Sequence, residues 1–404
     1  MRKQLTIIFF TVFIDLVGFG MIIPLNTFLA RKFGGDELQI GLLMSIYSFM
    51  QFIFSPIWGR ISDHWGRRPV ILISLLGASL AHLGFAFGES FIALLLARAF
   101  AGIFGGNIST AMAYIADITE SKDRSKGMGL IGAAFGLGFI AGPMLGGIAG
   151  HYGQMISHEP PFGMSFAAIL ASAICFINFC AALFILPETL KRTKDLMTRR
   201  PSRFKALFQA FKTPVIGSLM TSFFLANVAM AFMEVSLFMF VDDRFNWNLT
   251  KASLGFAYVG FIMVFTQGYL IRKMLPKYGE RKLLAVGLML SGLGITGIAF
   301  SYYIPVLAFV ITLLGLGIGF VNPSINGSIS LLSAKDQQGG TLGINQSLSA
   351  LGRILGPALG GLFYREFGLQ SPFLVGGTCM ALALAVVIWK YQQLPEGAIE
   401  AGAH

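Results

Sequence analysis

The chain has 404 residues, of which 55% are hydrophobic and only 12% are charged. Because soluble domains carry roughly 25% charged residues, this composition excludes a water-soluble globular protein and indicates an integral membrane protein. A transmembrane helix needs about 20 mostly apolar residues. The sequence predicts twelve such helices, at residues 5–30, 39–59, 69–88, 91–118, 127–150, 163–186, 214–241, 250–271, 283–300, 304–331, 341–364 and 370–390. Membrane-spanning strands are excluded, since they would need the alternating pattern of a closed barrel.

The net charge is +11, and the basic residues are distributed unequally between the two sides of the membrane. Most of the 30 Lys and Arg residues fall in segments that the twelve helices place on one side, and the few on the other side are Arg31, Lys32, Arg244, Lys251 and Arg365. The positive-inside rule predicts that both termini are cytoplasmic. The basic excess is therefore expected to reflect topology and contact with anionic lipid, with no nucleic-acid partner. Residues 5–30 are too long for a cleavable signal peptide and are predicted to form the first helix.

The first predicted helix carries an acid, Asp15, deep in its apolar run. An ionisable side chain is costly within a membrane span and is by default a candidate for function. Asp15 is therefore a candidate for proton binding. The alternative is an acid that caps or pairs within the bundle.

The loop between the second and third predicted helices reads Gly59-Arg60-Ile61-Ser62-Asp63-His64-Trp65-Gly66-Arg67-Arg68-Pro69. Gly59 is expected to allow close helix packing, and Gly66 to make the turn. The side chains of Asp63, Arg67 and Arg68 are expected to form a charge cluster at the cytoplasmic edge of the membrane. The alternative is an ordinary basic loop.

Polar side chains also lie within the second, third and fourth predicted helices, at Gln51, His82, Arg98 and Asn107. A buried arginine is expensive in hydrocarbon, so Arg98 is a functional candidate, although it is close enough to the end of its span to extend outward instead. His82 is able to titrate near neutral pH, but a lone histidine in an apolar helix is more often structural. We expect Gln51, His82 and Asn107 to line a substrate cavity.

A ten-residue motif occurs twice, as Gly138-Phe139-Ile140-Ala141-Gly142-Pro143-Met144-Leu145-Gly146-Gly147 and as Gly352-Arg353-Ile354-Leu355-Gly356-Pro357-Ala358-Leu359-Gly360-Gly361. The offset, 352 minus 138, maps the fifth predicted helix onto the eleventh. This predicts two parallel six-helix bundles, at residues 1–186 and 214–404, joined by a cytoplasmic linker at 187–213. Glycines four residues apart allow close helix contact, and Pro143 is expected to bend its helix. A gate and a purely structural packing role both remain open.

The second half adds its own polar residues. Glu234 shares one helical face with Asn227, and it is a second candidate for proton binding. Further candidates for the substrate cavity are Asn322, Asn326, Asn345, Gln346 and Arg353. Arg353 replaces Phe139 of the first copy of the motif and is expected to be a buried cation.

Other function classes find little support. The phosphate-binding motif G-x-x-x-x-G-K-[ST] is absent from the sequence, so ATP is not expected to be the energy source. The three cysteines and five histidines show no metal-ligand spacing, so neither a metal nor another cofactor is expected. No set of nucleophile and base indicates an enzyme.

Four of these segments resemble the major facilitator superfamily. The loop 59–69 resembles its signature loop, Arg98 and Gly102 its fourth-helix motif, and residues 138–147 the fifth-helix motif associated with antiporters. The first helix is similar to that of drug/proton antiporters of the tetracycline-efflux type. The resemblance covers most of the N-terminal half. One departure is that tetracycline exporters carry an acid after the G-A-S-L of the third helix, where this chain has Ala81 and His82.

The resemblance implies a twelve-helix major facilitator fold that works by alternating access. It implies export of a small amphipathic or cationic compound in exchange for protons. Asp15 and Glu234 are then expected to face the cavity, and Arg98 to adjust the proton affinity of Asp15. It also implies that Asp117 joins the loop cluster as a conformational latch. The expected setting is the bacterial inner membrane, with a monomer as the unit and the proton gradient as energy source. The alternatives are a facilitator or proton symporter for a polar metabolite, and a sensor that binds ligand without transport.

Overall fold

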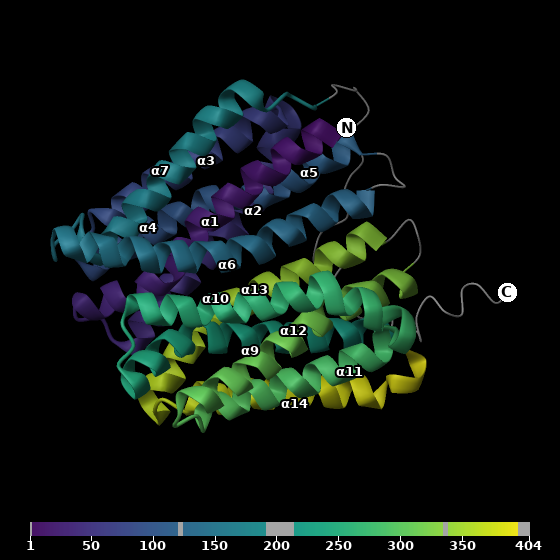
Figure 1. Cartoon of the computed structure of the whole chain (residues 1–404). Coiled ribbons are helices and arrows are strands. Elements are labelled where there is room, and N and C mark those ends of the chain that lie inside the picture. Colours follow the sequence, from purple (N-terminus) through teal and green to yellow (C-terminus); the bar gives the residue numbers. More distant parts are fainter. Residues whose placement is uncertain (1, 120–123, 191–213, 334–337, 395–404) are drawn as a thin grey trace. The chain divides into compact units, whose positions relative to one another are not determined.

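The computed structural model describes residues 2–119, 124–190, 214–333 and 338–394, and the regular elements in these residues are helices (Figure 1). The elements before residue 190 are α1 (Arg2–Lys32), α2 (Glu37–Trp65), α3 (Arg67–Ala86), α4 (Phe91–Phe104), η1 (Gly105–Asn107), α5 (Ile108–Ile118), α6 (Arg124–Ile156), η2 (Gly163–Ser165) and α7 (Phe166–Ile185). Those after residue 213 are α9 (Pro214–Phe245), α10 (Leu249–Phe265), η3 (Thr266–Leu270), α11 (Ile271–Ala299), α12 (Ile304–Leu332), α13 (Gln338–Phe367), α14 (Ser371–Trp389) and η4 (Tyr391–Gln393).

The helices follow the predicted spans. Ten helical segments of the described residues are long and apolar enough to cross a membrane. One of them, Leu249–Ala299, covers the two predicted spans 250–271 and 283–300, and α13 covers the predicted span 341–364. The prediction of an all-α membrane protein is confirmed. Several helices extend past their apolar runs, because helical hydrogen bonding continues into the polar residues at each end.

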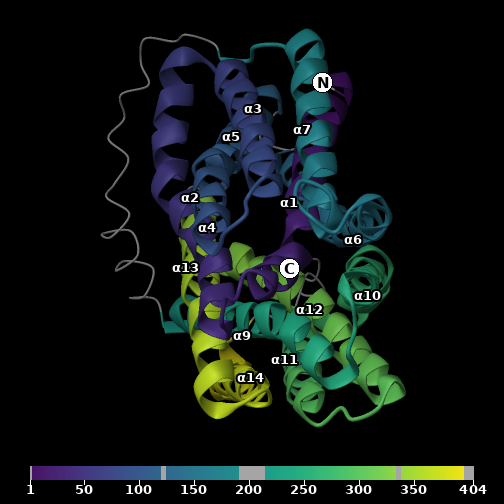
Figure 2. The same cartoon turned by 90° about the vertical axis from the view of Figure 1, so that its left-hand side faces the viewer.

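The chain forms two compact units. The first comprises residues 1–194 with 238–260, and the second comprises 195–237 with 261–404. Helix α9 therefore runs through both units. In the first unit α1 lies beside α6 and α3 beside α7, and in the second α11 packs against both α12 and α14 (Figures 1 and 2). The linker predicted at 187–213 falls mostly outside the described residues, and the two-bundle boundary stays a prediction.

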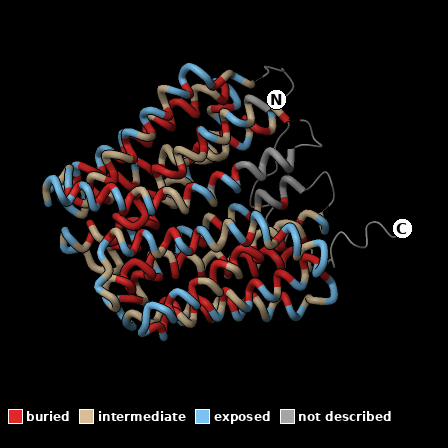
Figure 3. Tube along the Cα trace, in the orientation of Figure 1, coloured by how far each residue is buried: buried red, intermediate tan, exposed pale blue. Residues whose placement is uncertain are grey.

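Both units contain many buried residues (Figure 3), and most of the buried side chains are apolar. In the first unit a buried cluster joins α1, α3, α5 and α7 around the fully buried Tyr114, with Ile8, Leu75 and Ile115. Local signals set the helix ends in this unit. Asp36 and Gln39 form a capping box at the start of α2. Gly66 alone separates α2 from α3, with a φ of 113° that favours glycine.

The duplicated motif packs its helix against another helix at backbone distance. A Cβ atom at Gly142 of α6 would lie 2.7 Å from the Cα atom of Gly20 in α1, and one at Gly138 would lie 2.8 Å from the Leu16 Cβ atom. The second copy does the same in α13, where a Cβ atom at Gly352 would lie 3.1 Å from the Cβ atom of Asn227 in α9. Each copy thus joins the motif helix to the helix that carries a candidate proton-binding acid.

We expect Gly142→Ala to weaken this contact. The added methyl group has no space against the α1 backbone, so the substitution should lower the free energy of unfolding by about 1–3 kcal/mol. Gly132→Ala on the same helix is the matched control, because no atom lies within 4 Å of its Cβ position. Thermal unfolding of the purified protein in detergent measures both. Equal melting temperatures for the two variants would contradict the packing role.

Candidate functional site

The predicted fourth helix is interrupted where a polar site forms. The span 91–118 is divided into α4 and α5 by a single 3₁₀ turn, Gly105–Asn107. This turn leaves backbone carbonyl groups that helix α2 satisfies. The Gln51 amide donates to the Gly105 carbonyl at 2.7 Å, and the Trp58 indole donates to the Ile103 carbonyl at 2.6 Å. The break in the helix is therefore stabilised by hydrogen bonds from side chains of α2.

The same turn positions Asn107 beside the acid of α1. The Asn107 amide donates a hydrogen bond of 3.2 Å to the Asp15 carboxylate. Asn107 is buried, and Asp15 is half-buried. A neutral amide partner leaves the carboxyl able to exist with or without its proton, since no salt bridge fixes its charge in this contact.

Arg98 lies deep in the first unit and does not extend outward. Its side chain is 2% exposed, and its guanidinium stands over the Tyr47 ring at 4.6 Å and the Phe19 ring at 5.6 Å. Its Nε–H donates to the Leu43 carbonyl at 3.4 Å. Cation–π contacts of this kind stabilise a charge that has little access to water. The Arg98 charge thus lies beside Phe19, which follows Asp15 by one turn of α1.

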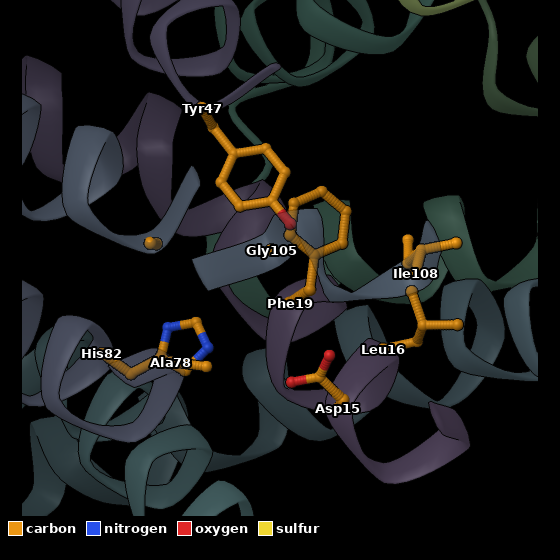
Figure 4. A pocket seen from close by; sticks show the side chains of 9 residues that line it. Asp15, Leu16, Phe19, Tyr47, Ala78, His82, Gly105 and Ile108 are labelled. Carbon is orange, nitrogen blue, oxygen red and sulfur yellow. The ribbon is translucent and has the colours of Figure 1, made fainter. Parts of the chain in front are cut away.

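His82 completes the set of polar residues in this part of the first unit. It is buried on α3, and together with Asp15 and Tyr47 it lines a cavity of about 20 Å³ (Figure 4). Of the residues predicted for the substrate cavity, Asn107 contacts Asp15 and His82 lines the same cavity as Asp15, whereas Gln51 contacts Gly105 of the 3₁₀ turn.

The second unit contains a separate polar cluster. The Ser349 hydroxyl donates to the Asn227 side-chain carbonyl at 2.6 Å, and the Asn345 amide donates to the Asn326 side-chain carbonyl at 3.2 Å. The Asn326 amide donates in turn to the backbone carbonyl of Asn322 at 2.9 Å. Helices α9, α12 and α13 are thus joined by amide and hydroxyl groups. Glu234 is half-buried on α9, two turns beyond Asn227.

One expectation for α13 is wrong, and the assignment of its residues to a substrate cavity stays a prediction. Arg353 was predicted to be a buried cation, and this is wrong, since the residue is exposed in the structure. Gln346 is exposed as well. The residues that face α9 are instead the motif glycines and Ser349. The face of the helix that each residue occupies depends on rotation about the helix axis, which the repeat alone does not fix.

Residues 59–69, predicted as a loop, form the end of α2, the Gly66 turn and the start of α3, and they hold a charge cluster around one buried arginine. Arg67 is 8% exposed, and its guanidinium contacts Asp63 at 2.6 Å, Asp117 at 3.1 Å and the Ser62 hydroxyl at 2.7 Å. Arg68 turns away and donates to the Leu183 carbonyl at 2.5 Å. Gly59 lies near Ser109 of α5.

Glu188 completes this cluster, and the sequence patterns did not reveal it. Its carboxylate accepts from the backbone N–H groups of Arg67 at 2.9 Å and Arg68 at 3.2 Å, the first residues of α3. It also accepts from the N–H groups of Thr189 and Leu190. Burial raises the pKa of the Glu188 carboxyl, but these four N–H donors outweigh burial and hold the pKa below its ordinary value. The carboxylate thus acts as an N-terminal cap for α3 from a distant segment.

A second set of ionic contacts lies at the C-terminal end of α1. The Arg31 guanidinium contacts Asp242 at 2.5 Å and Asp243 at 2.7 Å, both at the C-terminal end of α9. These pairs, which we call the Arg31 clamp, lie within the first compact unit. They hold one end of α9, the helix that runs through both units. The sequence revealed Arg31 only as a charge on the less basic side.

Comparison with known proteins identifies the family. Residues 8–278 and 273–402 match the family model of the Major Facilitator Superfamily. The chain belongs to the Major Facilitator Superfamily. It is 31% identical over 370 residues to the tetracycline resistance protein, class H, of Pasteurella multocida, covering 90% of each chain. It is 30% identical to multidrug resistance protein 2 of Bacillus subtilis (strain 168), covering 94% of this chain and 93% of that relative.

A solved structure agrees in fold. The crystal structure of the human organic anion transporter MFSD10 (TETRAN) matches with a TM-score of 0.68 and 27% identity, covering 96% of this chain and 99% of that one. The predictions of a major facilitator fold, of the drug/proton antiporter group and of a transporter rather than an enzyme are confirmed. The chain is a multi-pass membrane transporter of the proton-coupled efflux type.

We expect Glu188→Gln to lower the free energy of unfolding by about 1 kcal/mol at pH 7, the usual contribution of a helix cap. Because the folded-state pKa lies below the ordinary value, the carboxylate stabilises the fold above the ordinary carboxyl range. This contribution is lost as the pH falls through that range toward the folded-state pKa. Thermal unfolding from pH 7 down to about pH 3 should show the difference from wild type shrinking below about pH 4.5, the ordinary pKa of glutamate. Glu366→Gln, at an exposed pair with Arg365, is the control and should change little.

We expect the Arg31 clamp to be energetically coupled. A double-mutant cycle with Arg31→Ala and Asp243→Ala should give a coupling free energy of about 1–2 kcal/mol, because the side chains are half-buried and the contact is bidentate. The adjacent pair Lys32 and Glu159, 3.5 Å apart with Glu159 78% exposed, should give less than about 0.5 kcal/mol. Denaturation of the four proteins of each cycle measures both. Equal coupling in the two cycles would rule out a special role for the clamp.

Proposed function

We propose that Asp15 binds the exchanged proton and that the chain exports a small amphipathic or cationic organic compound by alternating access. The observation that carries this proposal is the environment of Asp15. Its carboxyl is half-buried on α1, accepts a hydrogen bond from a neutral amide, and lies near the buried charge of Arg98. A carboxyl in such a place is able to gain and lose a proton as its access to water changes.

The charges explain how a proton and a cation compete. With Asp15 ionised, its charge and that of Arg98 cancel, and a cationic compound meets little repulsion. With Asp15 protonated, the Arg98 charge is uncompensated and repels a cation. Proton binding on one side of the membrane and substrate binding on the other then exclude each other. A transported species drives such a cycle only through its different affinity for the two states.

Glu234 is the second proposed acceptor of a proton or cation. It occupies the helix of the second unit that corresponds to α1 in the repeat, since α13 packs on α9 as α6 packs on α1. The cluster of Asn227, Asn326 and Asn345 supplies uncharged hydrogen-bonding groups in the same unit, with Asn227 two turns before Glu234 on α9. Amide groups of this kind orient a substrate without fixing its charge.

The substrate class follows from the same residues and from the relatives. Relatives are named for resistance to tetracycline, to multiple drugs and to quinolones. Ala81 and His82 stand where tetracycline exporters carry an acid, which argues for another compound. An apolar chain with 39 Phe and 18 Met residues suits an amphipathic molecule.

Two ionic contacts are proposed to control the conformational cycle. The cluster of Asp63, Arg67 and Asp117 acts as the latch on the cytoplasmic side. The Arg31 clamp acts at the C-terminal end of α1. Interfaces of this type switch between discrete arrangements. We further propose the bacterial inner membrane as location, cytoplasmic termini, a monomeric unit and the proton gradient as energy source.

We expect Asp15→Asn to abolish export driven by a pH gradient, because the amide cannot exchange a proton. Proteoliposomes loaded with ethidium and given an inward proton gradient measure this by fluorescence. Glu89→Gln, which removes an exposed carboxylate outside the site, should keep wild-type export. Full proton-driven export by Asp15→Asn would exclude Asp15 as the acceptor. Proton-driven uptake by the wild type would favour a symporter instead.

A further inference from the structure

A small cavity in the first unit joins two titratable side chains. It lies between α1, α2, α3 and α4 and has a volume of about 20 Å³. Its polar side chains are Asp15, Tyr47 and His82. Figure 4 shows the Asp15 carboxylate and the His82 imidazole facing the same space from α1 and α3. A cavity of this size accommodates about one water molecule.

The His82 ring needs such a partner. It is only 4% exposed, and none of the hydrogen bonds formed within the described residues reaches it. Buried polar groups are almost always hydrogen-bonded, and a neutral imidazole offers one donor and one acceptor. A water molecule in the cavity satisfies the ring. Because Asp15 lines the same cavity, that water is also within reach of the carboxylate.

The backbone of α1 leaves room for this arrangement. Gly18 lies three residues after Asp15, on the same side of the helix. A Cβ atom at Gly18 would lie 3.6 Å from His82 Nε2 and 2.7 Å from the Cys175 Sγ atom of α7. The imidazole therefore lies against α1 within one turn of the carboxyl, and a side chain at Gly18 would first clash with Cys175.

The other charged and titratable groups around His82 limit its protonation. Arg98 of α4 is permanently charged, and its guanidinium stands over the ring of Tyr47, which lines the same cavity as His82. The Tyr47 phenol of α2 and the Cys175 thiol of α7 are ordinarily neutral near pH 7. Protons on both Asp15 and His82 would leave the Arg98 charge and the imidazolium charge uncompensated in the same part of the unit, which is electrostatically unfavourable.

We propose that Asp15 and His82, joined by a water molecule in this cavity, form one proton-binding pair. This inference rests on the proposed function, in which a proton is exchanged at Asp15. It assigns that proton to Asp15 and His82 together. The step is a proton transfer: the pair takes a proton from water on one side of the membrane and returns it to water on the other. Only O–H and N–H bonds form and break. Groups coupled in this way titrate together.

The test is a pH titration of the Asp15 carboxylic acid in purified, reconstituted protein. Infrared difference spectra follow its C=O band, which is identified by its loss in Asp15→Asn. In His82→Gln the midpoint of this titration should move by about one pH unit or more, as expected for coupled groups. The pH profile of ethidium export should move with it. His151→Gln, at an exposed histidine of α6, is the matched control and should leave both unchanged.

An unchanged midpoint in a folded His82→Gln protein would overturn the pair, even where wild-type export is proton-coupled. A shifted midpoint with no proton-driven flux in the wild type would support the pair and refute the proposed function. The two failures are thus distinguishable.

A reciprocal measurement covers the case in which His82→Gln does not fold. Coupling is mutual, so Asp15→Asn must change the titration of His82 as well. Ring ¹⁵N resonances of the five labelled histidines report this. One histidine whose titration changes in Asp15→Asn supports the pair, and five unchanged titrations overturn it.

Discussion

The backbone contact between α1 and α6 is the constraint on which the rest of the first unit depends. Gly20 and Gly142 bring the two helices together at a distance that excludes any side chain, and Gly138 rests on Leu16, next to Asp15. With one face of α1 closed in this way, Asp15 and Gly18 face α3, η1 and α7, which carry His82, Asn107 and Cys175 respectively. The second copy of the motif repeats the contact between α13 and α9, with Glu234 on the supported helix. A duplicated packing device thus supports each candidate acid.

The electrostatic consequence is a site with one fixed and one variable charge. Arg98 is held by aromatic rings and a carbonyl group, so its charge persists through the cycle. Asp15 accepts from a neutral amide, so its charge is free to vary with protonation. In the proposed cycle, the net charge of these two groups alternates between zero and plus one. This alternation is sufficient to make a proton and a cationic compound mutually exclusive occupants, which is the requirement for exchange.

The sequence predicted the features that depend on local composition and left out those that depend on packing. Hydropathy located the helices, and Asp15, Arg67 and the motif glycines followed from residue type and spacing. The contacts that complete the site join distant segments: Asn107 to Asp15 across 92 residues, Arg67 to Glu188 across 121 and Arg31 to Asp242 across 211. No local pattern records these pairs. The expected burial of Arg353 was wrong for a related reason, because helix rotation decides which residues of α13 face α9.

The most direct test of the central claim is proton movement driven by the substrate alone. Proteoliposomes loaded with an exported compound and a trapped pH-sensitive dye are diluted into compound-free buffer at equal pH. Exchange at Asp15 predicts that the lumen becomes acidic as the compound leaves, and that Asp15→Asn releases the compound, if at all, without a pH change. An alkaline shift in the lumen, or compound release without a pH change in the wild type, would contradict the account.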